Sequence, residues 1–227
     1  MRVGPAGYYH LGLFGLFLPY LAIKSSRVLA SRPLPPKVKH FTSTILTLIV
    51  FFAVSVWVAH NQWIALFPGE VPEPRMVLLG ATVLVGLVVL MRPLWRRRVE
   101  ARTRRVWLFM PRTGKERLLW AGCSVAAGIS EEATYRGVMF ALLWRLTDSA
   151  LAASLIAAAV FSVSHFLQGW KSMAIIFGMA LSFQLIAFLS GSLYIGMAVH
   201  ALYDIAAGLS YGKYGEELGY PLEPMPA

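Results

Sequence analysis

Long hydrophobic segments alternate along the chain with short polar or basic connections. The segments cover residues 8–23, 41–66, 76–95, 118–144, 150–167, 172–190 and 191–210. Most of them hold about 20 residues with almost no charge, which is the length that an α-helix needs to cross the hydrocarbon core of a bilayer. The pattern therefore predicts an all-α fold, a polytopic transmembrane helical bundle with about 6–8 membrane helices.

The composition agrees with this prediction. Hydrophobic residues make up 57% of the 227 residues and charged residues only 14%, whereas a soluble domain has roughly 25% charged residues. A chain of this size is expected to form one compact bundle. The single cysteine, Cys123, lies in a hydrophobic segment, which indicates a small buried side chain.

Basic residues are concentrated in two connections, at 24–40 and 92–117, whereas the connection at 67–75 holds two acids, one arginine and three prolines. Because loops rich in lysine and arginine stay in the cytoplasm, we expect the two basic loops inside and residues 67–75 outside. This explains the net charge of +10 without nucleic acid as a partner. We expect an integral protein of a bacterial plasma membrane, with a loose cytoplasmic tail at 211–227.

Charged and polar residues within the hydrophobic segments form three short motifs. They are Ser130-Glu131-Glu132-Ala133-Thr134-Tyr135-Arg136-Gly137, Phe161-Ser162-Val163-Ser164-His165 and His200-Ala201-Leu202-Tyr203-Asp204. A charge at the centre of a membrane helix costs about 2.5–3.5 kcal/mol on insertion scales. Residues that carry such a cost are expected to have a function.

The first motif pairs an acid with a base. In a helix Glu132 and Arg136 are neighbours one turn apart, and the arginine keeps the carboxylate ionised and fixes its direction. Glu131 lies about 100° around the helix and need not share this partner. We expect one glutamate to serve structure and the other chemistry. A polar patch at a helix contact would explain Glu132 and Arg136 well, and Glu131 poorly.

The other motifs add two imidazoles and a second carboxylate. Asp204 lies one turn after His200 and can orient it, while Phe161 is expected to pack beside His165. Glutamate is a competent general base in a site of low dielectric constant, and a histidine can hold a developing oxyanion. No cofactor is required for this chemistry.

Zinc is the alternative. Two histidines and a carboxylate could bind the ion and leave a water in the open position. The candidate ligands are Glu131, His165, His200 and Asp204. The chain has no His-Glu-x-x-His sequence, which excludes the common zincin arrangement.

The three motifs, in this order on successive helices, resemble the CPBP family, the CAAX-processing and bacteriocin-processing intramembrane endopeptidases also called Abi or type II CAAX prenyl endopeptidases. The resemblance covers roughly residues 115–210, and Tyr135-Arg136-Gly137 matches the usual end of the first motif. It implies an all-helical core with its site in the membrane. The third motif ends in Asp204, where the eukaryotic enzymes carry asparagine.

The resemblance also implies a role for each motif. Glu131 would activate the water with the help of His165, and Glu132 would be its structural neighbour beside Arg136. His200 and Asp204 would form the side that positions the oxyanion or the water. The resemblance implies either a glutamate-type or a metal-dependent enzyme.

We divide the chain into transmembrane helices and basic loops at 1–114, a protease-like core at 115–210 and the tail at 211–227. The predicted function is an intramembrane endopeptidase that hydrolyses a peptide bond of a membrane-anchored protein or peptide in the lipid bilayer. The alternative is a non-catalytic immunity or scaffold protein with a buried polar network. A proton-coupled transporter ranks last, because no pair of broken segments repeats in two halves of the chain.

One geometric condition must be met for Glu131 and His165 to act together. A straight helix entering the membrane at Leu118 would bring Glu131 about 20 Å deep, whereas His165 would lie near the cytoplasmic end of its own helix. The glutamate helix must therefore tilt strongly or break. The small residues Ala126-Ala127-Gly128 favour a break near Gly128.

Overall fold

The computed structural model describes residues 2–67 and 72–223. Throughout this described part the regular structure is helical, without a strand, which confirms the predicted all-α class. The elements are α1 (Pro5–Gly12), the π-helix η1 (Leu13–Phe17), α2 (Leu18–Ser31), α3 (Lys37–Asn61), α4 (Pro74–Glu100), the 3-10 helix η2 (Arg104–Phe109), α5 (Gly114–Glu131), the π-helix η3 (Glu132–Met139), α6 (Phe140–Thr147), α7 (Ala150–Ser164), the 3-10 helix η4 (Phe166–Gln168), α8 (Trp170–Ser190) and α9 (Tyr194–Glu217).

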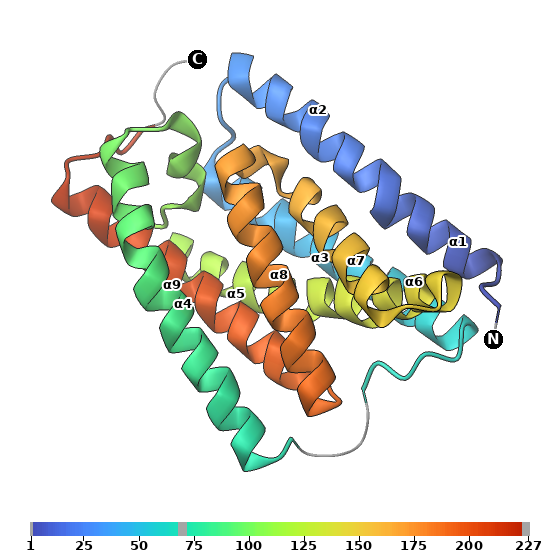
Figure 1. The fold of residues 1–227 in the computed structure, drawn as a ribbon. Coiled ribbons are helices and arrows are strands. Elements are labelled where there is room, and N and C mark those ends of the chain that lie inside the picture. Colours follow the sequence, from blue (N-terminus) through green and yellow to red (C-terminus); the bar gives the residue numbers. More distant parts are fainter. Residues whose placement is uncertain (1, 68–71, 224–227) are drawn as a thin grey trace.

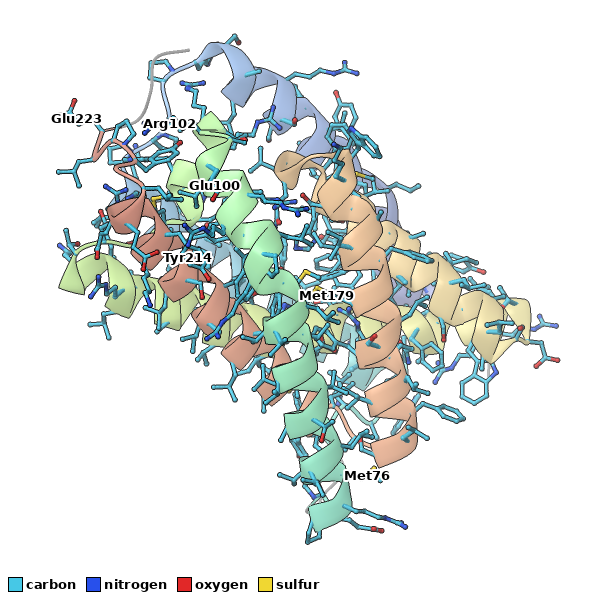
Figure 2. All side chains as sticks on the ribbon, turned by 60° about the vertical axis from the view of Figure 1, so that its left-hand side comes forward. Met76, Glu100, Arg102, Met179, Tyr214 and Glu223 are labelled. Atoms are coloured by element: carbon cyan, nitrogen blue, oxygen red, sulfur yellow. The ribbon has the colours of Figure 1, made fainter. Side chains whose placement is uncertain are left out.

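Four helices are long and apolar enough to cross a membrane: the rod Pro5–Ser31, which joins α1, η1 and α2, and helices α3, α4 and α8. Helix α4 runs along the front of the molecule in Figure 2, between the labelled residues Met76 and Glu100. Its side chains Leu78 and Leu90 are 69% and 67% exposed, which is costly in water and favourable in lipid. The helices support the predicted polytopic bundle of an integral membrane protein. The orientation of the loops stays a prediction, and residues 68–71 of the expected outer loop lie outside the described residues.

The helices with the polar motifs lie in the middle of the bundle. Helix α5 packs between α3 and α9, and α4 covers another side of α9 (Figure 1). Helix α7 packs against α6, α8 and α2. The long outer helices therefore surround α5, α7 and α9, which bring the three motifs together.

Helix α5 is continuous through Gly128, so the predicted break there is wrong. Gly128 instead allows a close approach to α9, because a Cβ atom at this position would lie 2.6 Å from the carbonyl oxygen of Met197 and 2.9 Å from the Cβ atom of Ala201. Gly128, one of the small residues that suggested a break, is thus needed for helix packing.

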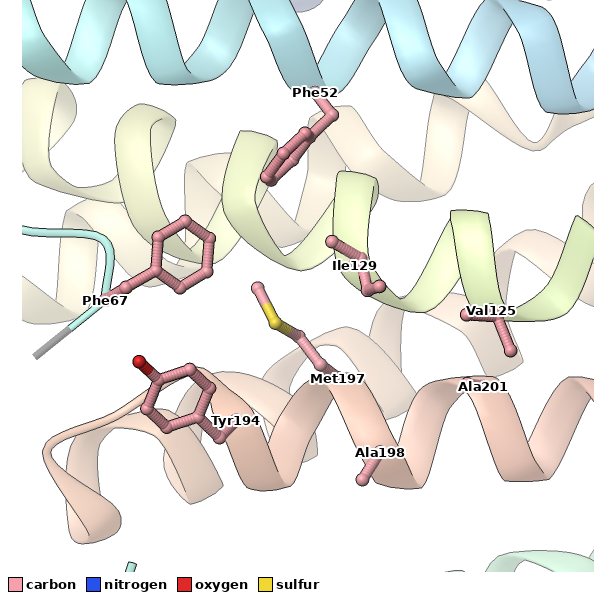
Figure 3. A pocket seen from close by; sticks show the side chains of 8 residues that line it. All are labelled: Phe52, Phe67, Val125, Ile129, Tyr194, Met197, Ala198 and Ala201. Atoms are coloured by element: carbon pink, nitrogen blue, oxygen red, sulfur yellow. The ribbon is translucent and has the colours of Figure 1, made fainter. Parts of the chain in front are cut away.

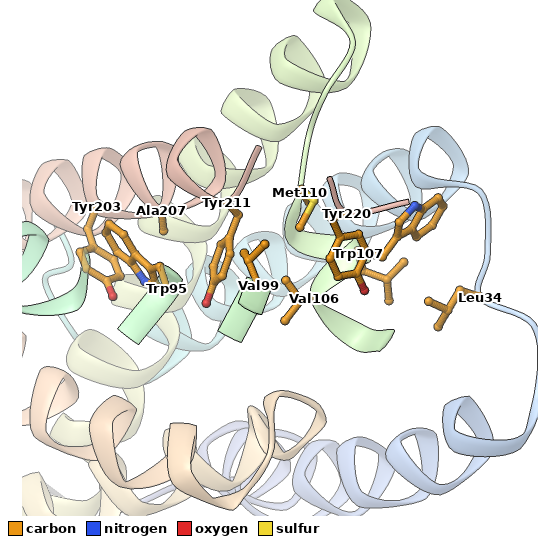
Figure 4. Close-up of a cluster of buried hydrophobic side chains, with 11 residues drawn as sticks. Leu34, Trp95, Val99, Val106, Trp107, Met110, Tyr203, Ala207, Tyr211 and Tyr220 are labelled. Carbon is orange, nitrogen blue, oxygen red and sulfur yellow. The ribbon is translucent and has the colours of Figure 1, made fainter. Parts of the chain in front are cut away.

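The predicted loose tail is also wrong for the part that the structure describes. Helix α9 continues to Glu217, and Tyr211 and Tyr220 are buried in an aromatic cluster with Trp95 and Trp107 (Figure 4). The indole of Trp107 donates a hydrogen bond to the carbonyl oxygen of Leu222 (2.8 Å). Glycine and proline suggested a tail, but the tyrosines anchor this segment to η2 and α4. Residues 224–227 lie outside the described residues.

Candidate active site

The three polar motifs meet where α5, η3, α7 and α9 converge. Glu131 is the last residue of α5 and Glu132 the first residue of η3, so the two glutamates stand at a junction between an α-helix and a π-helix. His165 follows the end of α7, and His200 lies within α9. The structure thus brings together all the residues that the sequence singled out, in two groups that differ in burial.

Glu132 and Arg136, here called the buried pair, are enclosed by protein. Glu132 is fully buried, and its Oε1 atom lies 3.2 Å from Nη1 of Arg136 and 2.9 Å from Nδ1 of His200. The guanidinium of Arg136 lies 4.2 Å from the ring centroid of Phe161, a favourable cation–π distance. The sequence spacing of Glu132 and Arg136 correctly indicated their contact. The contact with His200 joins the first motif to the third.

Glu131, His165 and Asp204, here called the open group, keep part of their surface exposed. Their side chains are 18%, 23% and 32% exposed. Oε2 of Glu131 lies 3.9 Å from Nε2 of His165 and 3.7 Å from Nε2 of His200, and Oδ2 of Asp204 lies 3.7 Å from the same His200 atom. These distances are too long for direct hydrogen bonds and suit contacts through a shared water.

Each histidine is held by one ring nitrogen and presents the other to Glu131. Nδ1 of His165 lies 2.8 Å from the carbonyl oxygen of Phe161. A carbonyl only accepts, so this nitrogen carries the hydrogen and a neutral His165 has a lone pair on Nε2. His200 likewise contacts Glu132 through Nδ1, which leaves Nε2 for Glu131 and Asp204. Phe161, expected only to pack, thus also orients His165.

Sequence reasoning missed several residues that support the site. The indole of Trp120 donates to the carbonyl oxygen of Asp204 (2.8 Å), and the hydroxyl of Tyr135 donates to Oγ of Ser164 (3.3 Å). A Cβ atom on Gly196 would lie 3.3 Å from Oε2 of Glu132, so glycine there leaves room for the buried carboxylate. These contacts join distant parts of the chain, and no local pattern indicates them.

A cavity of about 250 Å³ lies beside the open group. Glu131, Tyr135, Ser164 and His165 form one wall of it. Residues of α2 and α3 form the other: Leu18, Ser43, Thr44, Thr47, Leu48 and Phe51. The buried pair does not take part in this lining, so a molecule in the cavity would meet Glu131 and not Glu132.

A larger cavity of about 570 Å³ lies between α3, α5 and α9 (Figure 3). It is lined by Phe52, Phe67, Val125, Ile129, Tyr194, Met197, Ala198 and Ala201. Ala201 is the one motif residue in this lining, and the charged and polar residues of the motifs take no part in it. The mostly apolar lining of this cavity suits apolar groups, and it contains none of the candidate catalytic residues.

The donor set of the site is chemically suited to zinc, since it combines carboxylates with imidazoles. In a tetrahedral zinc site the ligand atoms lie roughly 3.3 Å from one another, closer than the 3.7–3.9 Å between Glu131, His165 and His200. Among residues 2–67 and 72–223, no three His, Cys, Asp or Glu side chains converge closely enough for a metal ion. The fit to a zinc ion is therefore incomplete.

Part of the chain matches a known protein family. Residues 113–206 match the family model described as type II CAAX prenyl endopeptidase Rce1-like. The matched segment begins after η2, ends within α9 and contains all three motifs. No curated protein and no solved structure matches the chain.

Proposed function

From the family match, which supports membership of the CPBP family through residues 113–206, we propose that the protein is an intramembrane endopeptidase. It hydrolyses a peptide bond of a membrane-anchored protein or peptide near the cytosolic face of the bilayer. The observation that carries the proposal is the position of Glu131, which belongs to the open group, faces the imidazoles of His165 and His200 and borders a cavity. A purely structural polar network would not need this exposure.

The reaction begins with a water held between Glu131 and Nε2 of His165. Glu131 removes one proton while the water oxygen attacks the carbonyl carbon of the scissile peptide bond. In its doubly protonated form, which the contact with the Glu132 carboxylate favours, His200 donates a hydrogen bond from Nε2 to the resulting oxyanion. The proton taken by Glu131 then passes to the leaving nitrogen as the C–N bond breaks, which yields one new carboxyl group and one new amine.

The buried pair serves this reaction through His200. Glu132 holds Nδ1 of His200 at 2.9 Å, and Arg136 fixes the carboxylate of Glu132. The imidazole thus keeps its Nε2 atom directed at the place where the oxyanion forms. Glu132 and Arg136 are positioning residues, whereas Glu131, His165 and His200 contact the reacting atoms. Asp204 helps to place the water or His200.

Zinc would use the same residues. Glu131, His165, His200 and Asp204 would hold the ion, which would lower the pKa of its bound water and polarise the peptide carbonyl. The glutamate-type reaction requires no metal, so a chelator leaves it unchanged.

The test compares wild type with Glu131→Gln. Both are purified in detergent and incubated with a library of membrane-anchored peptides, and the products are read by mass spectrometry. We expect wild type to cleave, and the variant to lose about 10²–10⁴-fold in rate because it lacks the base. Glu100→Gln is the matched control, since Glu100 is exposed and pairs with Arg96 on α4. The same assay with a chelator tests the zinc alternative.

Two outcomes would contradict the proposal. If both Glu131→Gln and His165→Ala still cleave a verified peptide, the assigned residues are wrong. If wild type, folded and monodisperse, cleaves no peptide of the library, a non-catalytic immunity or scaffold role with a buried polar network becomes the better reading.

A further inference from the structure

We propose that the hydroxyl groups on α3 facing the smaller cavity form a subsite that binds the backbone of an extended substrate segment. The inference rests on the proposed peptidase function and adds where and in what conformation the substrate lies. The subsite consists of Ser43, Thr44 and Thr47, opposite Glu131 and His165 across the cavity of about 250 Å³. Helix α3 lies outside the segment that matches the family.

The three hydroxyls offer acceptors to the cavity. Each uses its hydrogen within α3, because Ser43 and Thr44 donate to the carbonyl oxygen of His40 (2.8 and 2.9 Å), and Thr47 donates to that of Ser43 (2.9 Å). A hydroxyl oxygen still has lone pairs after its hydrogen is used. The wall of the cavity is therefore matched to a ligand that brings N–H donors.

A peptide chain brings N–H donors only when it is not helical. In a membrane helix each backbone N–H is hydrogen-bonded within the helix. A helical substrate would therefore have no free N–H group to donate to the hydroxyls of α3. Hydroxyls four residues apart, such as those of Ser43 and Thr47, repeat at roughly 6 Å along a helix. Every second N–H of an extended chain repeats at roughly 6.6 Å. The two spacings are close enough for successive hydrogen bonds.

The size and the remaining lining of the cavity agree with a short extended segment. Its volume is below the roughly 300–1,000 Å³ of a small-molecule site, and a helix is about 10–12 Å wide. Leu18, Leu48 and Phe51 cover the rest of the α2 and α3 wall. We expect an unwound stretch with small or apolar side chains, held by α3 so that one carbonyl faces Glu131.

The first test measures binding without cleavage, so that it does not depend on catalysis. The probe is a short fluorescent, membrane-anchored peptide of alanine and leucine, bound to the Glu131→Gln protein in detergent and followed by anisotropy. Thr47→Val keeps the shape of the side chain and removes the acceptor. With Ser43→Ala added, we expect the affinity to fall about tenfold, because substrate N–H groups lose their partners.

Thr82→Val is the matched control. Thr82 is an exposed threonine on α4 that donates to the carbonyl oxygen of Leu78 (2.9 Å) in the same way, but it lines neither cavity. Its removal should leave the affinity unchanged. Equal affinity of all variants would overturn the subsite, whatever the outcome of the cleavage assay.

A second test removes the donor from the peptide. N-methylation of single backbone nitrogens should weaken binding to the Glu131→Gln protein at one or two positions. The same methyl groups should have much less effect once Thr47 and Ser43 are replaced. Equal losses with both proteins would show that the hydroxyls and the substrate backbone do not interact, and would overturn the inference.

Discussion

Glu131 and Glu132 are adjacent in the chain, but their carboxylates lie in opposite surroundings. Glu132 belongs to the buried pair, is fully enclosed and contacts both Arg136 and Nδ1 of His200. Glu131 belongs to the open group and borders a cavity. His200 touches both glutamates, each through a different ring nitrogen. Two adjacent glutamates can therefore have different roles: the fully buried carboxylate of Glu132 supports the structure, and the partly exposed carboxylate of Glu131 is available for chemistry.

The largest expected effect concerns the stability of the buried pair. Glu132→Ala leaves the Arg136 guanidinium buried without its carboxylate, and breaking a buried ion pair in this way costs roughly 3–5 kcal/mol. Glu131→Ala removes a partly exposed carboxylate that makes no direct hydrogen bond, so it should cost less than about 1 kcal/mol. Unfolding of both variants in the same detergent measures the difference.

A double variant separates the lost charge from the lost packing. Glu132→Leu with Arg136→Met replaces both charges by apolar groups, which is often neutral for stability. We expect it to recover much of the stability while remaining inactive, because His200 has lost its support. Equal destabilisation by Glu131→Ala and Glu132→Ala would break the distinction between the two groups.

The next effect concerns the packing that joins the groups. Gly128→Ala would bring a Cβ atom to 2.6 Å from the carbonyl oxygen of Met197, so α5 and α9 must separate. Overpacking of this kind costs roughly 1–3 kcal/mol. Since Glu132 lies on the α5 side and His200 on α9, we also expect about a tenfold lower kcat, measured with a peptide that wild type cleaves.

Gly86→Ala is the control for Gly128→Ala. A Cβ atom at Gly86 on α4 meets nothing within 4 Å in the described part of the protein, and alanine favours a helix over glycine by about 1 kcal/mol. It should leave activity unchanged and stability equal or higher. If Gly128→Ala behaves in the same way, the close approach of α5 and α9 does not position the site.

The sequence predicted the local part of this site better than its surroundings. Spacing of four residues in a helix is a local property, and it correctly indicated the contacts of Glu132 with Arg136 and of His200 with Asp204. The break at Gly128 was wrong because a glycine looks the same in sequence whether it ends a helix or admits a neighbouring one.

Long-range contacts were beyond what the sequence could indicate. The junction of α5 with the π-helix η3 and the cavity wall on α3 depend on how distant segments pack. Tyr211 and Tyr220 were read as parts of a polar tail, and only the fold brings them to Trp95 and Trp107. Polar motifs in apolar segments therefore indicate which residues form the candidate site, whereas the cavity and the packing around these residues depend on tertiary structure.

The smallest expected effect comes from outside the matched segment. Arg105 on η2 donates through Nη1 to the carbonyl oxygen of Leu167 (3.0 Å) and through Nη2 to that of Ser26 (2.9 Å). It thus links the end of α2 to the turn that directly follows His165. Arg105→Gln cannot make both bonds, so His165 of the open group should be held less firmly, whereas the buried pair should be unaffected. We expect kcat to fall about threefold with KM nearly unchanged, and the free energy of unfolding to fall by about 1–2 kcal/mol, because hydrogen bonds from a charged donor are lost.

Arg104→Gln is the matched control for Arg105→Gln. Arg104 is the neighbour of Arg105 on η2 and also donates to two carbonyl oxygens, those of Leu29 and Arg32, but both bonds go to the end of α2 and the loop that follows it. Its loss should change stability as much as the loss of Arg105 and leave kcat as it is. Arg105→Lys should recover only part of the rate, because an ammonium group lacks the planar fork of a guanidinium. If the Arg104 and Arg105 variants lower kcat equally, η2 acts on the protein only through stability, and His165 is positioned by Phe161 and α7 alone.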